Sequence, residues 1–174
     1  MKTFFVQTFG CQMNEYDSER IAHRLESLGL TLCTDIFSSD LALINTCSVR
    51  AKPEQKTASL LGKLRQNRYK TGQPLFIGVM GCMAQDKGGE LIKRFRNVDF
   101  VLGTDRIDKL EVVLKELLNG KKFVDTSEGG VFFVEPFKRR QGAVTAKITI
   151  MKGCNNFCSY CIVPYVRGRE VCRN

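Results

Sequence analysis

Three cysteines near the carboxyl end of the chain form its most specific chemical pattern. Cys154, Cys158 and Cys161 are spaced C-x3-C-x2-C in the segment GCNNFCSYC, directly after an apolar stretch. Three thiolates this close together can hold one 4Fe-4S cube and leave its fourth iron without a protein ligand. Electron-transfer cubes are closed by four cysteines, so an open iron indicates a cluster that a substrate coordinates. The alternatives are a zinc site completed by a distant ligand and three unligated thiols.

A second set of cysteines is dispersed along the first half of the chain. Cys11, Cys47 and Cys82 each directly follow a strand-like stretch, namely FFVQTFG, LALINT and LFIGVMG. In an open parallel sheet the carboxyl ends of the strands share one edge, where ligand sites form, so three such thiols can converge. Any one of them alone would be interpreted as a small buried core residue. Three equivalent placements, in a chain that already has one three-cysteine motif, favour a second iron–sulfur site.

The remaining candidate residues carry weaker signals. Cys33 lies inside a predicted strand, so we interpret it as a core residue. The pattern assigns no role to Cys172. Asp17 and Glu19 could suggest acid–base catalysis, but acidic side chains in the first turn of a helix are explained by the helix dipole, and we prefer that interpretation.

The composition indicates the cellular compartment of the protein and hence the redox state of its thiols. The chain of 174 residues is 43% hydrophobic and 26% charged, which is typical of a globular protein that needs no disulfides to fold. No apolar run approaches the ~20 residues that cross a bilayer, and no secretion signal is present, so we expect a cytoplasmic protein with no membrane attachment. Thiols stay reduced there, which favours metal ligands over disulfides. No residue pattern decides the oligomeric state, and a monomer is our working expectation.

The net charge is +9, from 27 Lys and Arg against 18 Asp and Glu. An excess of this size favours a polyanionic partner such as nucleic acid. A basic surface that only contacts solvent is equally compatible with the charge alone.

The elements that must position the cysteines alternate between strands and helices. Apolar runs bounded by turn residues predict the strands, and apolar residues at helical spacing predict the helices. We predict strands at 3–8, 30–36, 41–45, 75–80 and 100–102, and helices at 15–28 after an Asn14 cap, from Pro53 to Gly72, at 90–95 and at 105–118. Alternation of this kind implies right-handed crossovers and a mainly parallel sheet with helices on both faces. The expected fold is a doubly wound α/β domain.

Domain organisation follows from where this alternation ends. We predict an α/β domain at 1–120, a linker at 121–142 that includes the basic run Lys138 to Arg140, and a second domain at 143–174 that opens with a strand at 143–151. A domain needs at least ~50 residues, so we expect the second one to be incomplete in this chain.

The sequence segments around the cysteines resemble those of a known family. The C-x3-C-x2-C motif, with an aromatic residue, Tyr160, before its last cysteine, resembles the radical S-adenosylmethionine superfamily. GCQMNEYDSE, NTCSVRAKPEQK, GCMAQ and GCNNFCSYCIVPYVRGRE together are similar to the methylthiotransferase family. The Gln-Met-Asn after Cys11 and the Ser-Val-Arg after Cys47 resemble its MiaB-type branch, which acts on tRNA. The sister branches usually show Pro-Lys-Asn or Lys-Val-Asn after the first cysteine, and neither is present.

The resemblance implies both cofactors and site residues. One 4Fe-4S cluster is held by Cys11, Cys47 and Cys82 and carries the sulfur that is methylated. A second 4Fe-4S cluster, on Cys154, Cys158 and Cys161, cleaves S-adenosylmethionine to a radical, with the Tyr160 region against the adenine. The segment from 143 is then the first strand and cluster loop of a radical-SAM barrel, and family members continue into a small RNA-binding domain. Cys172 stands where the family commonly has Ser.

The implied reaction replaces the hydrogen at carbon 2 of N6-isopentenyladenosine, adjacent to the anticodon in tRNA, with a methylthio group. That hydrogen is not usefully acidic, so a general base would achieve little and a radical route is required. The partners implied are tRNA, a one-electron reductant and a sulfur donor. The competing hypotheses are a sister enzyme that modifies another tRNA adenosine or a ribosomal protein, and a non-catalytic iron–sulfur electron carrier. We expect this chain alone to be inactive, because it holds only the start of the barrel.

Overall fold

A six-stranded parallel sheet forms the centre of the molecule. The computed structural model describes residues 1–49, 51–129, 145 and 147–173. The sheet has the order β2-β1-β3-β4-β5-β6, and every neighbouring pair of strands is parallel. Its strands are β1 (Thr3–Phe9), β2 (Thr31–Leu32), β3 (Leu41–Thr46), β4 (Phe76–Met80), β5 (Phe100–Leu102) and β6 (Phe123–Asp125). The predicted parallel sheet is confirmed.

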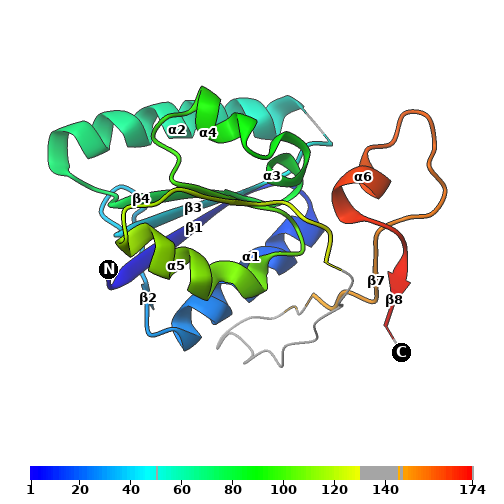
Figure 1. The fold of residues 1–174 in the computed structure, drawn as a ribbon. Helices are drawn as coiled ribbons and strands as arrows, with labels where there is room; N and C mark the ends of the chain where they lie inside the picture. Colours follow the sequence, from blue (N-terminus) through cyan, green and yellow to red (C-terminus); the bar gives the residue numbers. More distant parts are fainter. Residues whose placement is uncertain (50, 130–144, 146, 174) are drawn as a thin grey trace.

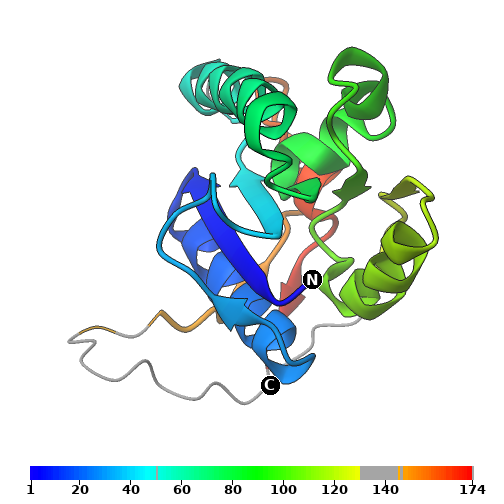
Figure 2. The same cartoon turned by 90° about the vertical axis from the view of Figure 1, so that its left-hand side faces the viewer.

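Helices cover both faces of this sheet (Figures 1 and 2). On one face lie α1 (Gln12–Ser27), the 3-10 turn η1 (Ile107–Lys109) and α5 (Leu110–Leu118), and on the other lie α2 (Ala51–Thr71), α3 (Cys82–Lys87) and α4 (Glu90–Arg94). Strand β3 separates the two cores, because Leu41 and Leu43 join the core under α1 while Ala42 and Ile44 join the core under α2. All four are fully buried, as alternation along a central parallel strand requires. The doubly wound fold class is confirmed.

Some element boundaries differ from the prediction. Helix α1 begins at Gln12 with Cys11 as its N-cap, so the predicted cap at Asn14 is wrong and Asn14 lies inside the helix. The strand predicted at 30–36 is only Thr31–Leu32, because the Asp35 carboxylate accepts a hydrogen bond from the Phe37 N–H and turns the chain. Cys33 therefore lies past the strand and is half-buried, which corrects its assignment to the core.

Two elements of the first hundred and thirty residues had no sequence signal. Helix α3 spans six residues, too few to show a helical period. Strand β6 falls within the stretch predicted as a linker, so the sheet extends to Asp125, beyond the boundary placed at 120. The basic run Lys138 to Arg140 lies outside the described residues. The division into domains at 120 and 143 stays a prediction.

A smaller unit follows near the end of the chain. Strand β7 (Met151–Lys152) pairs antiparallel with β8 (Val171–Cys172), and α6 (Val163–Arg167) lies between them in sequence. The strand predicted at 143–151 is regular only at Met151, since 145 and 147–150 have no regular structure and 143, 144 and 146 lie outside the described residues.

The strand order identifies the edge where a ligand site is expected. Successive strands lie on opposite sides of β1, with β2 on one side and β3 on the other. Open α/β sheets bind ligands at the carboxyl ends of the strands where the order reverses in this way. In Figure 1 the red segment with α6 lies beside this edge, and α6 packs against α3.

The close approach of β4 and β5 gives a test of the packing. A Cβ at Gly78 would overlap the ring of the fully buried Phe100. We expect Gly78→Ala to lower the free energy of unfolding by about 1–3 kcal/mol, the usual cost of overpacking a core. Urea unfolding followed by circular dichroism measures it. The control is Gly62→Ala in α2, where the added Cβ would meet no packed atom within 4 Å. The higher helix propensity of Ala should there raise the free energy of unfolding by up to about 1 kcal/mol. Equal midpoints for both variants would contradict the packing of β4 on β5.

Candidate functional site

Three cysteines lie at the carboxyl edge of adjacent strands. Cys11 follows β1 and caps α1, Cys47 follows β3, and Cys82 follows β4 and opens α3. The backbone N–H of Cys47 donates to the Phe9 carbonyl at 2.9 Å, so the pairing of β1 with β3 continues up to this cysteine. Cys47 and Cys82 are buried, whereas Cys11 is exposed. The site therefore has two enclosed thiols and one that faces solvent.

Gly81 brings the turn that carries Cys82 against the end of β3. Its φ is +90°, and a Cβ there would overlap the side-chain oxygen of Asn45 and come within 2.7 Å of the Thr46 carbonyl oxygen. Only glycine tolerates both the left-handed backbone and this approach. Cys82 is thereby held next to the strand end from which Cys47 emerges.

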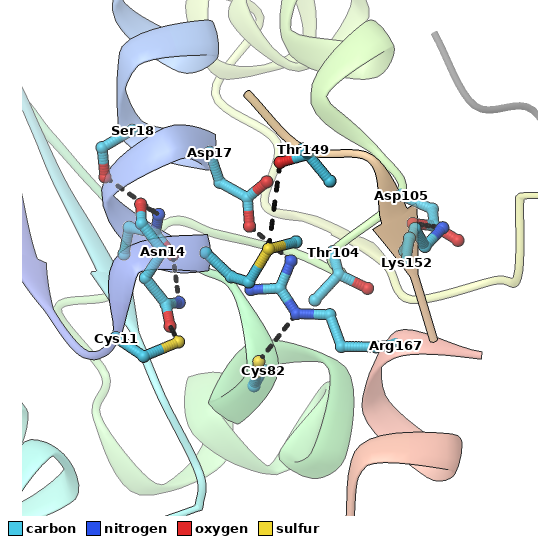
Figure 3. Close-up of polar contacts among 12 residues, drawn as sticks. Cys11, Asn14, Asp17, Ser18, Cys82, Thr104, Asp105, Thr149, Lys152 and Arg167 are labelled. Atoms are coloured by element: carbon cyan, nitrogen blue, oxygen red, sulfur yellow. Dashed lines mark hydrogen bonds and ion pairs between the residues drawn. The ribbon is translucent and has the colours of Figure 1, made fainter. Parts of the chain in front are cut away.

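A buried amide pair fixes the start of α1 against β3 (Figure 3). Asn14 Nδ2 donates to Asn45 Oδ1 at 3.1 Å, and Asn45 Nδ2 donates to the Asn14 carbonyl at 2.8 Å and to Ser18 Oγ at 2.9 Å. The Cys11 thiol donates to Asn14 Oδ1 at 3.4 Å. Both amides are almost fully buried. The pair therefore sets the distance between the loops that carry Cys11 and Cys47.

Arg167 reaches this edge from the last turn of α6. Its Nε donates to Cys82 Sγ at 3.1 Å, and its Nη1 pairs with Asp17 Oδ2 at 2.5 Å. The side chains of Arg167 and Asp17 are only 8% and 7% exposed. This buried group joins α1, α3 and the carboxyl-terminal segment (Figure 3).

Sequence reasoning missed this group. Because α1 begins at Gln12, neither Asp17 nor Glu19 is in its first turn, and the helix-dipole interpretation of both is wrong. Glu19 is exposed, whereas Asp17 is a buried ion-pair partner. A signal was present, since Asp17 shares a spacing of four with the buried Ile21 and Leu25. A carboxylate on the buried stripe of a helix needs a buried partner.

The electrostatics of the group follow from burial and charge. Burial raises the pKa of the Cys82 thiol, the charge and hydrogen bond of Arg167 oppose the rise, and the nearby Cys47 and Asp17 add to it. For Arg167, burial alone would lower the pKa, but the Asp17 carboxylate and the Cys82 sulfur outweigh it and raise the pKa. The guanidinium is therefore always charged, and it favours Cys82 in its anionic form.

The second set of cysteines lies in a loop folded back on the residues after α6. The N–H of Cys154 donates to the Gly168 carbonyl at 3.2 Å, and the N–H of Cys161 donates to the Cys158 carbonyl at 2.9 Å. Gly153, with φ +76°, is required because a Cβ there would overlap the Arg169 carbonyl. Cys158 is exposed, and its two partners are half-buried.

Two other residues singled out from the sequence lie at the surface. The side chain of Tyr160 is 90% exposed. Cys172 lies in β8, is exposed, and has its sulfur 3.7 Å from Glu170 Oε1. Neither contacts the Arg167 group.

The donors in both cysteine sets are sulfur only, which is the ligand type of iron–sulfur clusters. All eight cysteines are free thiols. Among the described residues, no three His, Cys, Asp or Glu side chains are close enough to hold one ion. A four-iron cube takes one ligand at each corner iron, so its thiolates lie further apart than the ligands of a single ion. Ligands that are sulfur only, with a buried cation donating to one of them, suit such a cube.

A cavity of about 450 Å³ lies between the sheet edge and the loop that carries Cys154, Cys158 and Cys161. Thr104 and Asp105, after β5, line one side, and the segment from Tyr165 to Arg169 lines another. Thr104 Oγ1 donates to the Val166 carbonyl at 2.9 Å, and Asp105 pairs with Lys152. Phe157 and Tyr165 add two aromatic rings in edge-to-face contact, with centroids 5.9 Å apart.

Comparison with known proteins identifies the family. Residues 3–103, which carry strands β1 to β5 and the cysteines that follow β1, β3 and β4, match the model of the "Uncharacterized protein family UPF0004". The chain belongs to this family. It is 48% identical over 171 residues to a protein of Syntrophobacter fumaroxidans, covering 95% of this chain and 37% of that protein. Proteins of Dictyoglomus thermophilum and Pelotomaculum thermopropionicum are 46% and 48% identical over the whole chain, which covers 40% of each.

Each of these relatives is named tRNA-2-methylthio-N(6)-dimethylallyladenosine synthase. The predicted resemblance to the MiaB-type methylthiotransferases is therefore confirmed. The chain spans about two fifths of the length of the curated relatives it matches. None of the helices in the described parts of the chain is both long and apolar enough to cross a membrane.

The amide pair at the cysteine loops is testable. We expect Asn45→Ala to lower the free energy of unfolding by about 1–3 kcal/mol, because it leaves buried polar groups of Asn14 unpaired. Urea unfolding of the metal-free chain measures the change. Asn119→Ala, at the exposed end of α5, is the matched control and should shift stability by less than about 0.5 kcal/mol. A loss no larger than that of the control would show that the amide pair does not hold α1 to β3.

Proposed function

We propose that this chain is part of a tRNA methylthiotransferase that places a methylthio group on carbon 2 of N6-isopentenyladenosine, adjacent to the anticodon. One observation carries the proposal. Two three-cysteine sets occur in one chain, and the residues next to the second set, Arg167 and Gly168, contact Cys82 and Cys154. The names of the relatives support the same activity.

The cysteines divide into two ligand sets in this proposal. Cys11, Cys47 and Cys82 hold one 4Fe-4S cluster, and Cys154, Cys158 and Cys161 hold another. Together with S-adenosylmethionine, these groups supply sulfur, methyl and one-electron chemistry when bound. Each set has three thiols, which leaves one position for a ligand that is not protein.

The protein itself holds and shields this chemistry. Burial of Cys47 and Cys82 keeps water from two of the three sulfur ligands in the sheet edge, while the exposed Cys11 leaves one side open. Tyr160, exposed at the end of the cluster loop, is available to the adenine of S-adenosylmethionine. The pair of rings at the cavity, Phe157 and Tyr165, gives a flat base a surface for stacking.

The substrate proposal follows from chemistry and charge. A hydrogen on carbon 2 of adenine needs no general base, and this fits a site whose buried carboxylate, Asp17, is committed to Arg167. The net charge of +9 supports tRNA as the polyanionic partner. We further propose that the protein acts in the cytoplasm as a monomer, with a one-electron reductant and a sulfur donor as partners.

Iron content tests the two ligand sets. We expect the complete protein, reconstituted anaerobically, to hold about eight irons, and the triple change Cys154→Ala, Cys158→Ala, Cys161→Ala to leave about half, because each set holds four. Iron analysis with visible absorption provides the measurement. The double variant Cys33→Ala, Cys172→Ala changes the same residue type outside both sets and should keep full iron. Undiminished iron in the triple variant would remove the second site from the proposal.

Nucleoside analysis tests the activity. We expect tRNA from a strain that lacks the gene to have N6-isopentenyladenosine without its methylthio group, and the intact gene to restore it. A gene with Cys11, Cys47 and Cys82 changed to Ala should restore none, although the purified variant still cleaves S-adenosylmethionine. Loss of a different methylthio nucleoside would favour a sister enzyme. Unchanged tRNA, together with no cleavage of S-adenosylmethionine, would favour an electron carrier.

A further inference from the structure

Arg167 has more hydrogen-bonding capacity in the site than the protein uses. Its side chain is enclosed, with Nε on Cys82 and Nη1 on Asp17. The third nitrogen, Nη2, is buried and has no hydrogen-bond partner among the described residues. Buried polar groups are nearly always paired, so an orphaned guanidinium nitrogen beside a thiol points to a further acceptor at the same place.

Arg167 interacts with Cys82 more strongly when this sulfur is charged. Its positive charge is offset by the single carboxylate of Asp17. A neutral thiol is a weak acceptor, so the Nε contact with Cys82 gains most of its strength when this sulfur is anionic. A metal-bound cysteine is a thiolate, and each further negative charge of a cluster would increase its interaction with the guanidinium.

Arg167 is not needed merely to hold the carboxyl-terminal segment in place. Thr104 binds the Val166 carbonyl, Asp105 pairs with Lys152, and Glu15 pairs with Lys147. These contacts fix the same segment to the same sheet edge without any contact to sulfur. Arg167 alone among the described arginines and lysines donates a hydrogen bond to a cysteine sulfur.

We propose that Arg167 is a positioning residue for the cluster on Cys11, Cys47 and Cys82, where its Nε–H bonds the ligating Cys82 sulfur and raises the reduction potential of that cluster. The proposal rests on the proposed function and goes beyond it. Positive charge and hydrogen bonds to sulfur stabilise the reduced, more negative form of an iron–sulfur cluster. Nη2 can donate a hydrogen bond to a second sulfur of the same site. Through the Cys154 N–H bond to Gly168, the neighbour of Arg167, the same segment supports the other cysteine set.

A potentiometric titration tests this role. The complete protein with Cys154, Cys158 and Cys161 changed to Ala retains only the first ligand set, so its signal is observed alone. It is loaded anaerobically with iron and sulfide, and the potential is read from the electron paramagnetic resonance signal during reductive titration. We expect Arg167→Gln in this background to shift the potential to a more negative value. Arg169→Gln, an exposed arginine two residues further along the chain, should leave it unchanged.

Two further variants keep the test decisive if Arg167→Gln does not load. Arg167→Lys retains the charge, but one ammonium cannot keep both contacts, so its potential should shift in the same direction by less. Asp17→Asn removes a negative charge from the group and should shift the potential the opposite way. Opposite shifts of the potential in the Arg167 and Asp17 variants are not expected if the pair only docks the segment. Loss of docking would then shift the potential in the same direction in both variants.

The outcomes separate this inference from the proposed function. Suppose that the first set loads iron and the Arg167 variants have the same reduction potential as the Arg169 control. Arg167 is then a docking residue, and the inference is overturned while the function stands. If Arg167→Lys and Asp17→Asn move the potential in the same direction, the inference is likewise overturned. If the background protein binds no iron, both the inference and the first cluster of the proposed function are lost.

Discussion

Parallel pairing of β1, β3 and β4 is the constraint on which the site depends. The register runs from Phe4 opposite Leu41 to Phe9 opposite Thr46, and from Leu41 opposite Phe76 to Asn45 opposite Met80. Because parallel strands end at the same edge, residues that follow them are brought together however far apart they are in sequence. A shift of one residue would turn each strand's side chains to the other core and displace the cysteine that follows. Apolar burial on both faces holds the register.

The site edge is stabilised differently from the cores. Around Cys11, Cys47 and Cys82 the contacts are one amide pair and one buried ion pair rather than aliphatic packing. Buried polar groups of this kind add little net stability, since desolvation offsets much of the attraction, but they are costly to misplace. They therefore fix the geometry of the loops, while the energy of folding comes from the two apolar cores.

Arg167 connects the carboxyl-terminal segment to the polar contacts at the sheet edge. It lies on a short helix of the carboxyl-terminal segment, yet its partners are on α1 and α3 of the sheet domain. The segment that carries C-x3-C-x2-C lies at the edge where the other three thiols emerge, where Thr104, Asp105 and Glu15 also hold it, with the cavity beside it. The proposed reaction, which uses two clusters on one substrate, needs both cysteine sets on a common surface, and the docking of α6 on α3 supplies one.

The sequence by itself determined the local features. Short sequence windows are enough to read three features: the positions of Cys11, Cys47 and Cys82 after strands, the parallel sheet with helices on both faces, and the spacing of Cys154, Cys158 and Cys161. Apolar periodicity and ligand spacing are local properties. Family resemblance in those windows was enough to indicate the chemistry.

Only the tertiary structure decided which polar side chains meet. Asp17 and Arg167 are 150 residues apart, and Asn14 and Asn45 are 31 apart, so no periodic pattern links either pair. Asp17 was assigned to a helix dipole because the helix was started three residues late, and β6 was missed because three residues show no period. Such contacts depend on how the sheet edge, α1 and α6 are placed in space, which is fixed by burial across the whole chain rather than by any one segment.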